Sequence, residues 1–139
     1  MKILDEYFMK QALKEAIYAY EKNEIPVGAI VVLNKNIIAQ AHNLTKQLKD
    51  ISAHAEIQAI GAAESFLKGK FLKECSLYVT LEPCIMCAGA ILWAKLGRLV
   101  FGASNTKLSL QKGIFSKESS LLLKSFFKKK RKSIIGQNL

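Results

Sequence analysis

The first half of the chain combines one helical pattern with two short apolar runs. Over residues 5–21, apolar side chains recur every three or four positions, which predicts an amphipathic helix. Pro26 comes soon afterwards and does not allow the helix to continue. The apolar runs 27–33 and 37–41 are joined by Asn34-Lys35-Asn36, which is typical of a tight turn. We therefore expect a helix followed by two antiparallel strands.

The middle of the chain predicts two further helices, each next to a strand. A helical period returns at 52–66. The β-rich run 76–80 is then followed by a helix of small residues at 84–95 and a strand at 98–102. A strand, a helix and a strand in this order form a crossover unit with parallel strands. The pattern therefore predicts an α/β protein with helices on the faces of a partly parallel sheet.

The end of the chain predicts a last strand at 107–112 and a closing basic helix from about residue 116 to 131. Neither an internal repeat nor a long linker divides the sequence. Residues 1–139 are therefore expected to form a single domain.

Composition and charge narrow the class of protein. Hydrophobic residues make up 50% of the chain, but the longest strongly apolar stretch, 85–94, is too short to span a bilayer. Two acids, Asp5 and Glu6, stand where a secretory signal would be apolar. We expect a soluble cytoplasmic protein with no membrane partner. The net charge of +10 favours a polyanionic partner, although lysines also simply keep a small protein soluble.

One histidine and two cysteines form the strongest candidate for a metal site. His54, Cys84 and Cys87 would give zinc three ligands and leave one position for water. Structural zinc normally has four protein ligands, whereas catalytic zinc keeps one position open. The set therefore indicates a hydrolytic zinc site. A structural zinc knuckle, with Cys75 or His42 as the fourth ligand, is the alternative.

Local spacing explains the two cysteines but not the histidine. Three positions apart at a helix start, Cys84 and Cys87 share one face, and Pro83 suits the first turn. The exposed amides of that turn should lower the thiol pKa values. His54 and Glu56 would point about 200° apart on a regular helix. Both reach the metal only from an irregular first turn or from opposite sides.

Glu56 has no place among the ligands and is the candidate for proton transfer. Two thiolates and an imidazole cancel the charge of zinc, so a bound water is acidified less than at a three-histidine site and needs a base. Glu56 could take its proton and deliver it to the substrate and to the leaving group. For this role we expect partial burial to raise the pKa of Glu56.

An ordered series of motifs extends over most of the chain: Ile25-Pro26-Val27-Gly28-Ala29, His42-Asn43, Ala53-His54-Ala55-Glu56, 80–90, 97–102 and Phe126-Phe127. The series includes H-x-E and P-C-x-x-C, the signature of zinc-dependent nucleobase deaminases. Taken together, these motifs resemble the bacterial tRNA-specific adenosine deaminases, within the cytidine deaminase-like superfamily. Between residues 103 and 113 the loop is shorter than relatives usually have.

The resemblance implies a three-layer α/β/α cytidine deaminase-like fold with a mixed central sheet. It also implies a homodimer that converts the wobble adenosine of a tRNA anticodon loop to inosine. By the same likeness, His54, Cys84 and Cys87 bind one zinc ion per chain and Glu56 carries protons. Asn43 would hold the flipped base through its side-chain amide, whereas without the resemblance it would be an ordinary turn residue.

Three more residues are expected near the substrate. Ala55 would offer its backbone to the base. Pro26 and Val27 would form an apolar wall of the pocket or, equally, only the junction between a helix and a strand. Trp93 is expected in a dimer interface or in the core rather than against the substrate.

Aromatic and basic residues near the end of the chain are candidates for RNA binding. Phe126 and Phe127 could stack on nucleotides, but neighbours on a helix point about 100° apart, so one of them is expected in the core. Lys128 and Arg131 would bind phosphates, unless the basic run is only a solvated tail. An anticodon loop fits because its splayed bases are the least costly to flip.

Two other functions stay open. A guanine or cytosine deaminase that acts on a free base would use the same metal, shuttle and fold, although a small neutral substrate gives no reason for the charge of +10. A noncatalytic RNA-binding module held together by zinc would need a four-ligand site and no function for Glu56.

Overall fold

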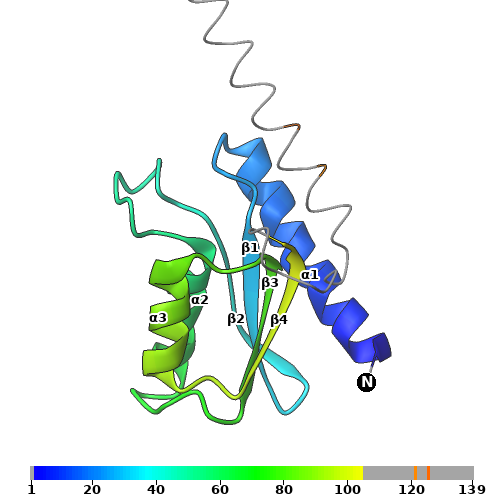
Figure 1. Ribbon diagram of the computed structural model, residues 1–139, viewed down its shortest axis with the longest axis vertical. Coiled ribbons are helices and arrows are strands. Elements are labelled where there is room, and N and C mark those ends of the chain that lie inside the picture. The colour runs from blue at the N-terminus through cyan, green and yellow to red at the C-terminus, as the bar shows by residue number, and fades with distance from the viewer. Residues whose placement is uncertain (1, 105–120, 122–124, 126–139) are drawn as a thin grey trace, which may run out of the picture.

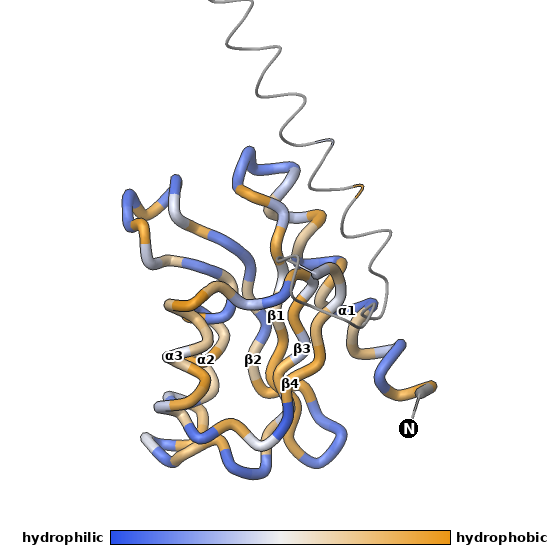
Figure 2. Tube along the Cα trace, viewed as in Figure 1, coloured by the Kyte–Doolittle hydropathy of each residue, from blue (hydrophilic) through white to orange (hydrophobic). Residues whose placement is uncertain are grey.

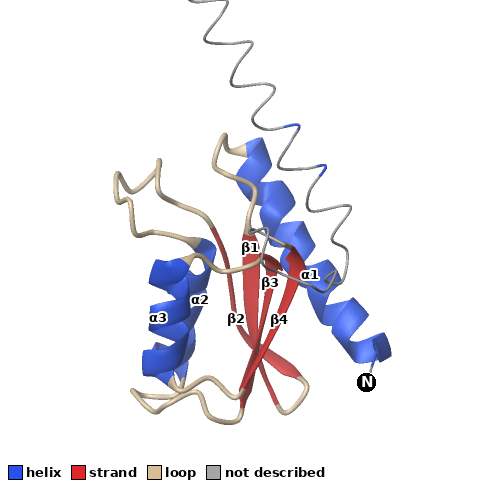
Figure 3. Ribbon diagram, in the orientation of Figure 1, coloured by secondary structure: helices blue, strands red, loops and turns tan. Residues whose placement is uncertain are grey.

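The computed structural model describes residues 2–104, 121 and 125 (Figure 3). Every element predicted up to residue 102 is confirmed, with ends within three residues of those expected. In chain order the elements are α1 (Lys2–Glu21), β1 (Gly28–Leu33), β2 (Asn36–His42), α2 (Ala55–Phe66), β3 (Cys75–Leu81), α3 (Ile85–Ala94) and β4 (Arg98–Ala103).

The predictions for the end of the chain fall largely outside the described residues. The strand expected at 107–112 and the shortened loop before it lie there, as do Phe126, Phe127, Lys128 and Arg131. Of the expected closing helix only Leu121 and Ser125 are described, and both are helical. Within the described part, none of the helices combines the length and the apolar composition needed to cross a membrane.

The strands form one mixed sheet in the order β2, β1, β3, β4 (Figure 1). Strand β1 pairs antiparallel with both β2 and β3, whereas β3 and β4 are parallel and are joined by α3. The hairpin turn between β1 and β2 places Asn34 and Lys35 at φ values of 51° and 66°. Two successive positive φ angles match the twist of a tight hairpin. The predicted hairpin and crossover unit are therefore both confirmed.

Helices cover both faces of the sheet, as Figures 1 and 2 show. Ile30 and Val32 of β1 face α1, where they pack against Phe8 and Met9. The alternate positions of the same strand, such as Val31, pack in the larger cluster that includes apolar residues of α2 and α3. Because both faces are buried, β1 is apolar throughout. The predicted three-layer α/β/α arrangement is confirmed.

Small residues let α1 approach the sheet closely at the start of β1. A Cβ atom on Gly28 would collide with the backbone of Ala12 and Ala16, which are themselves buried. A side chain at this position is therefore incompatible with the observed packing. The close crossing fixes the position of α1 against the start of β1.

Candidate metal centre and substrate pocket

Two helix starts bring the predicted metal ligands together. His54 immediately precedes α2 and Cys84 immediately precedes α3, both with extended backbone, and Cys87 lies in the first turn of α3. His54 Nδ1 lies 3.7 Å from Cys84 Sγ and 3.5 Å from Cys87 Sγ. Helices α2 and α3 lie side by side and begin at the same end of the sheet (Figure 1). This arrangement joins residues that are far apart in sequence.

The separations fit a tetrahedral zinc ion. With Zn–N near 2.0 Å and Zn–S near 2.3 Å, tetrahedral geometry places the nitrogen and sulfur atoms about 3.5 Å apart. The observed values of 3.5 and 3.7 Å agree with this distance. In the part of the chain that is described, no fourth histidine, cysteine or carboxylate joins the group. Three protein ligands and one open position form the arrangement typical of catalytic zinc.

The two residues considered as a fourth ligand have other surroundings. Cys75 is buried in the core at the start of β3. His42 Nδ1 lies 3.2 Å from Glu15 Oε2 of α1, which covers the opposite face of the sheet from α2 and α3. Within the described residues, the zinc-knuckle alternative therefore has no complete ligand set.

Glu56 lies beside the metal ligands without being one of them. Because His54 precedes α2 in an extended conformation, the regular helical spacing does not apply to this pair, as expected of an irregular helix start. The carboxyl group of Glu56 is 4% exposed and contacts the Cys87 thiol. Burial raises the pKa of Glu56, while its own backbone amide, Cys87 and the charge of His54 lower it to a smaller extent. The predicted rise in pKa is confirmed.

The pKa of the Cys87 thiol shifts in the direction opposite to the expected one. Burial raises the pKa of Cys87, and the neighbouring Glu56 and Cys84 raise it further. The expected lowering of the pKa was wrong for this residue, because desolvation and the neighbouring Glu56 and Cys84 all favour the neutral thiol. A cation at the centre of such a cluster reverses the balance and favours the thiolate. The donor set therefore fits a divalent metal.

The residues predicted to contact the substrate lie on the segments around this centre. The backbone N–H of Asn43 donates to the Val27 carbonyl at 3.1 Å, and its side-chain Nδ2 donates to Thr45 Oγ1 at 3.0 Å. Asn43 is buried, as are Pro26 and Val27. Ala55, the first residue of α2, is fully buried and belongs to the same core cluster as Val27. The structure thus brings Asn43 and Val27 together, and their roles toward a substrate stay predictions.

Sequence reasoning missed a buried carboxylate that is bonded to the loop following Asn43. Glu24 is 2% exposed and accepts hydrogen bonds from the backbone amides of Lys46 and Gln47, at 3.0 and 2.7 Å. These amides belong to the loop that joins Asn43 to His54. The only sequence signal was an acid between a helix end and a buried strand, where a solvated turn residue is equally common.

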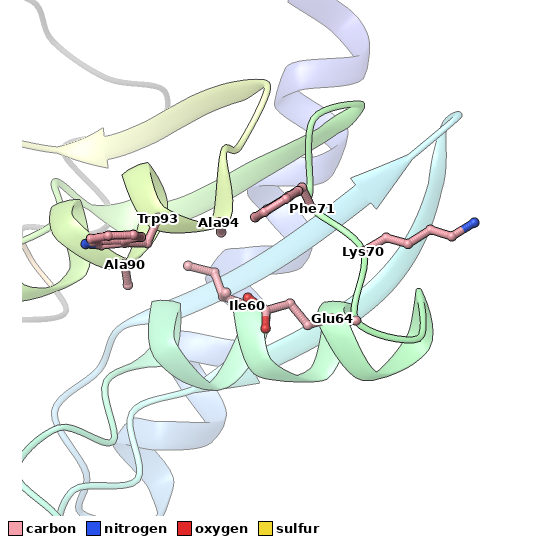
Figure 4. Close-up of a pocket in the computed structure, with 8 residues that line it drawn as sticks. Ile60, Glu64, Lys70, Phe71, Ala90, Trp93 and Ala94 are labelled. Atoms are coloured by element: carbon pink, nitrogen blue, oxygen red, sulfur yellow. The ribbon is translucent and has the colours of Figure 1, made fainter.

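A groove opens between α2 and α3 away from the metal ligands (Figure 4). It is lined by Ile60 and Glu64 of α2, Phe71, and Trp93 of α3, among others. Trp93 is 84% exposed, so the expectation of core packing was wrong for it. Its helix already buries its opposite side against the sheet, which leaves the indole outside. The alternative expectation, a dimer interface, remains a prediction.

Comparisons with known proteins agree with this geometry. The family model of the cytidine and deoxycytidylate deaminase zinc-binding region matches residues 2–103 of this chain. A tRNA-specific adenosine deaminase of Aquifex aeolicus is 43% identical, over 94% of this chain and 98% of its own length. The residues matched by the family model include the positions of His54, Cys84 and Cys87.

Two solved structures share the fold. One, from a study of A-to-I editing by tRNA:A34 deaminases at the wobble position of transfer RNA, has a TM-score of 0.79 and 38% identity. The alignment covers 84% of this chain and 99% of that one. A guanine deaminase from Bacillus subtilis has a TM-score of 0.69 and 32% identity, over 89% of this chain and 74% of its own. The first match is higher in identity and in coverage of the known structure.

Proposed function

Because the chain belongs to the cytidine and deoxycytidylate deaminase family, in which its relatives at about 40% identity are tRNA-specific adenosine deaminases, we propose that it converts the wobble adenosine of a tRNA anticodon to inosine. The single observation that carries the chemistry is the His54, Cys84 and Cys87 triad at two helix starts, with the buried Glu56 beside it. The reaction consumes one water and releases one ammonia.

One zinc ion per chain is part of the proposal. His54 Nδ1 and the two cysteine sulfurs would hold it, as their number, chemistry and separations favour. When bound, zinc supplies a Lewis acid that lowers the pKa of water and makes it nucleophilic near neutral pH. The closed core beneath the site keeps the three donors in place, since Ala55 and Cys87 are both fully buried.

Glu56 would move the protons of the reaction. Its carboxylate takes a proton from the attacking water and gives it to the ring nitrogen next to the carbon that bears the amino group. Water oxygen adds to that carbon, and Glu56 then passes the second water proton to the amino group, which leaves as ammonia. Its position in the first turn of α2, in contact with Cys87 and two residues from His54, supports this role.

Asn43 would hold the base in the pocket. One N–H of its amide is engaged by Thr45, which leaves the carbonyl oxygen and the other N–H for a purine edge. The backbone of Ala55 and the apolar residues Pro26 and Val27 would line the sides. Burial of Asn43 supports a specific contact, because a buried amide needs partners for its hydrogen-bonding groups.

A tRNA anticodon loop is the proposed partner. The charge of +10 favours a phosphate backbone, and Phe126, Phe127, Lys128 and Arg131 are the proposed contacts from the end of the chain. Flipping a base out of a loop costs less than flipping it out of a duplex. The same substrate implies that the enzyme acts in the cytoplasm, where tRNA is used.

The exposed side of α3 is the proposed homodimer contact. Ile85 and Leu92 lie seven positions apart, which places them on one helix face, and Trp93 adjoins them. All three are strongly exposed, at 92%, 77% and 84%. A contiguous apolar face of this kind is typical of an interface. Sedimentation should give a dimer for the wild type and a monomer for Trp93→Glu, while Ile51→Glu, equally exposed on another segment, stays dimeric.

The test of the substrate uses purified protein and a short anticodon stem-loop with adenosine at the wobble position. Free adenosine, guanine, cytosine and cytidine are offered in parallel, and products are identified by mass spectrometry. Inosine in the stem-loop alone is expected, with binding that weakens log-linearly as salt rises. Turnover of guanine or cytosine without turnover of the stem-loop would favour the free-base deaminase instead. RNA binding without any deamination, unaffected by Glu56→Gln, would favour the noncatalytic module.

A further inference from the structure

We infer that Glu24 is a positioning residue for Asn43, and that it acts by clamping the loop that joins Asn43 to His54. This inference rests on the proposed function, because it assigns Glu24 a part in holding the base of that reaction. The carboxylate of Glu24 is hydrogen-bonded to the backbone of Lys46 and Gln47, and not to a metal ligand or to Asn43. Its effect would pass through the backbone of residues 45–47.

Glu24 is held rigidly at the end of α1. Its amide N–H donates to the Ala19 carbonyl at 2.9 Å, and its side chain is 2% exposed. Each carboxylate oxygen accepts one backbone N–H, from Lys46 at 3.0 Å and from Gln47 at 2.7 Å. Hydrogen bonds to a charged acceptor are shorter and stronger than neutral ones. Two on consecutive amides fix both the position and the orientation of this peptide segment.

Thr45 connects the clamp to Asn43. It directly precedes the first clamped residue, and its Oγ1 accepts the hydrogen bond from Asn43 Nδ2 at 3.0 Å. The rotamer of Asn43 therefore depends on where the peptide of residues 45–47 lies. If that peptide shifts, the partner of the amide shifts with it.

Backbone hydrogen bonds hold the rest of the loop that joins Asn43 to His54. The two hydrogen bonds from Glu24 therefore determine where residues 45–47 lie. At its base, Asn43 N–H donates to the Val27 carbonyl and Leu44 N–H to the Ala53 carbonyl, at 3.1 and 2.9 Å. Within it, Asp50 N–H donates to the Thr45 carbonyl at 3.0 Å. His54 follows Ala53 directly. The loop thus carries a proposed base contact at one end and a proposed metal ligand at the other.

A role for Glu24 in folding alone predicts a different behaviour. A buried carboxylate that serves only to satisfy two loop amides would stabilise the fold, and its removal would lower stability and activity independently of Asn43. A positioning role predicts that the effect of changing Glu24 disappears once the Asn43 amide is absent. A double-mutant cycle separates the two, because only coupled residues deviate from additivity.

The variants are Glu24→Gln, Asn43→Ala and the double variant, compared with the wild type in single-turnover deamination of the stem-loop. Gln keeps the shape and one acceptor but turns an NH₂ toward a backbone N–H. We expect Glu24→Gln to lower kcat/KM about tenfold, the loss of one charge-assisted hydrogen bond, with unchanged zinc content. In the Asn43→Ala background the same change should cost less than about twofold. Additive effects, or no effect of Glu24→Gln, would overturn the inference.

Asp5→Asn is the matched control, since Asp5 is also a buried carboxylate with two partners, but it lies near the start of α1, whereas Glu24 follows the end of that helix. It should reduce stability without changing kcat/KM. Thr45→Val, which keeps the clamp and removes only the last link, should be non-additive with Asn43→Ala. If Glu24→Gln does not fold, Glu24→Asp, which keeps the charge but shortens the side chain, takes its place in the cycle with Asn43→Ala, with the same expected and contradicting outcomes.

A readout independent of activity is the side-chain amide resonance of Asn43 in ¹⁵N-labelled protein. Glu24→Gln should shift it and Asp5→Asn should not; the reverse pattern contradicts the inference. If the wild type does not deaminate the stem-loop, the proposed function fails. The cycle is then measured on whichever free base is turned over. If the wild type does deaminate it while the variants are additive, only the role of Glu24 fails.

Discussion

Two carboxylates of this protein are almost equally buried, but their pKa values shift in opposite directions. Glu56, beside the metal ligands, is 4% exposed, and burial raises its pKa. Asp5, at the start of α1, is 6% exposed, and its hydrogen bonds with Arg98 lower its pKa despite burial. Arg98 donates to both oxygens of Asp5, at 2.7 and 2.6 Å, and Tyr78 Oη donates to one at 2.6 Å.

The difference shows that the partners of a buried carboxylate decide whether it stabilises the fold or is available for chemistry. Asp5 has a guanidinium partner and ties α1 to β3 and β4, so its charge stabilises the native state. Among the described residues, none with a cationic side chain is hydrogen-bonded to Glu56, which lies next to groups that favour a cation themselves. A buried acid of the second kind costs stability in the absence of metal. Such residues are typical of reactive sites.

Replacing Glu56 should give the largest effect. Glu56→Gln keeps the shape of the side chain but removes the proton carrier, so deamination should fall by about a thousandfold or more. Zinc content, measured by mass spectrometry, should stay the same, and thermal stability should not fall. Glu64→Gln, on the same helix and facing the groove of Figure 4, is the control and should retain activity. Full activity in Glu56→Gln would contradict the proposed shuttle.

Removing the metal should give the next largest effect. A chelator should abolish deamination and lower the free energy of unfolding by about 4 kcal/mol, as expected for a ligand present at a thousand times its Kd. Calorimetry measures the shift, and zinc but not magnesium should reverse it, because the donors are thiolate and imidazole. Unchanged stability and activity after complete removal would show that the triad does not bind a required metal.

Breaking the hydrogen-bonded cluster of Asp5, Tyr78 and Arg98 should give a smaller effect, on stability and not on activity. Asp5→Asn removes charge-assisted hydrogen bonds to a partly exposed arginine, and should lower the free energy of unfolding by about 2 kcal/mol. The value of kcat should not change, since the cluster lies on α1, β3 and β4 away from the metal ligands. Denaturant unfolding and a parallel assay measure both quantities. Loss of activity in a folded Asp5→Asn protein would contradict the purely structural role of Asp5.

The pH dependence of stability should be the finest probe. The folded pKa of Asp5 is lowered, so its contribution is fully present above the unfolded value of about 3.9 and is lost as the pH falls through the lower folded value. The stability difference between wild type and Asp5→Asn should therefore be constant above pH 4 and shrink below it. Burial first, and then Asp5, raises the pKa of Tyr78 to about 12, so its contribution should be lost as the pH rises from 10 through 12. A difference that persists in acid would exclude the Asp5 charge as its source.

Local patterns predicted much of the fold because their causes are local. The 3.6-residue period of α1 and the two-residue turn at Asn34 and Lys35 depend on neighbours in sequence. The two cysteines also meet through local geometry, one before and one within the first turn of α3. The rise in the pKa of Glu56 was predictable once burial was assumed, whereas the change at Cys87 required the positions of its neighbours.

By itself, then, the sequence determined the elements up to β4, the α/β class with helices on the faces of a partly parallel sheet, and the types of side chain available for zinc chemistry. The tertiary structure decided how far these groups converge: His54 meets Cys84 because α2 and α3 begin at one end of the sheet. It also brought Glu24 under the loop at Lys46, paired Asp5 with Arg98 across 93 positions, and left Trp93 exposed. These contacts depend on strand register and on the angle at which helices cross the sheet. Neither is encoded in a local period, because both follow from packing among segments distant in the chain.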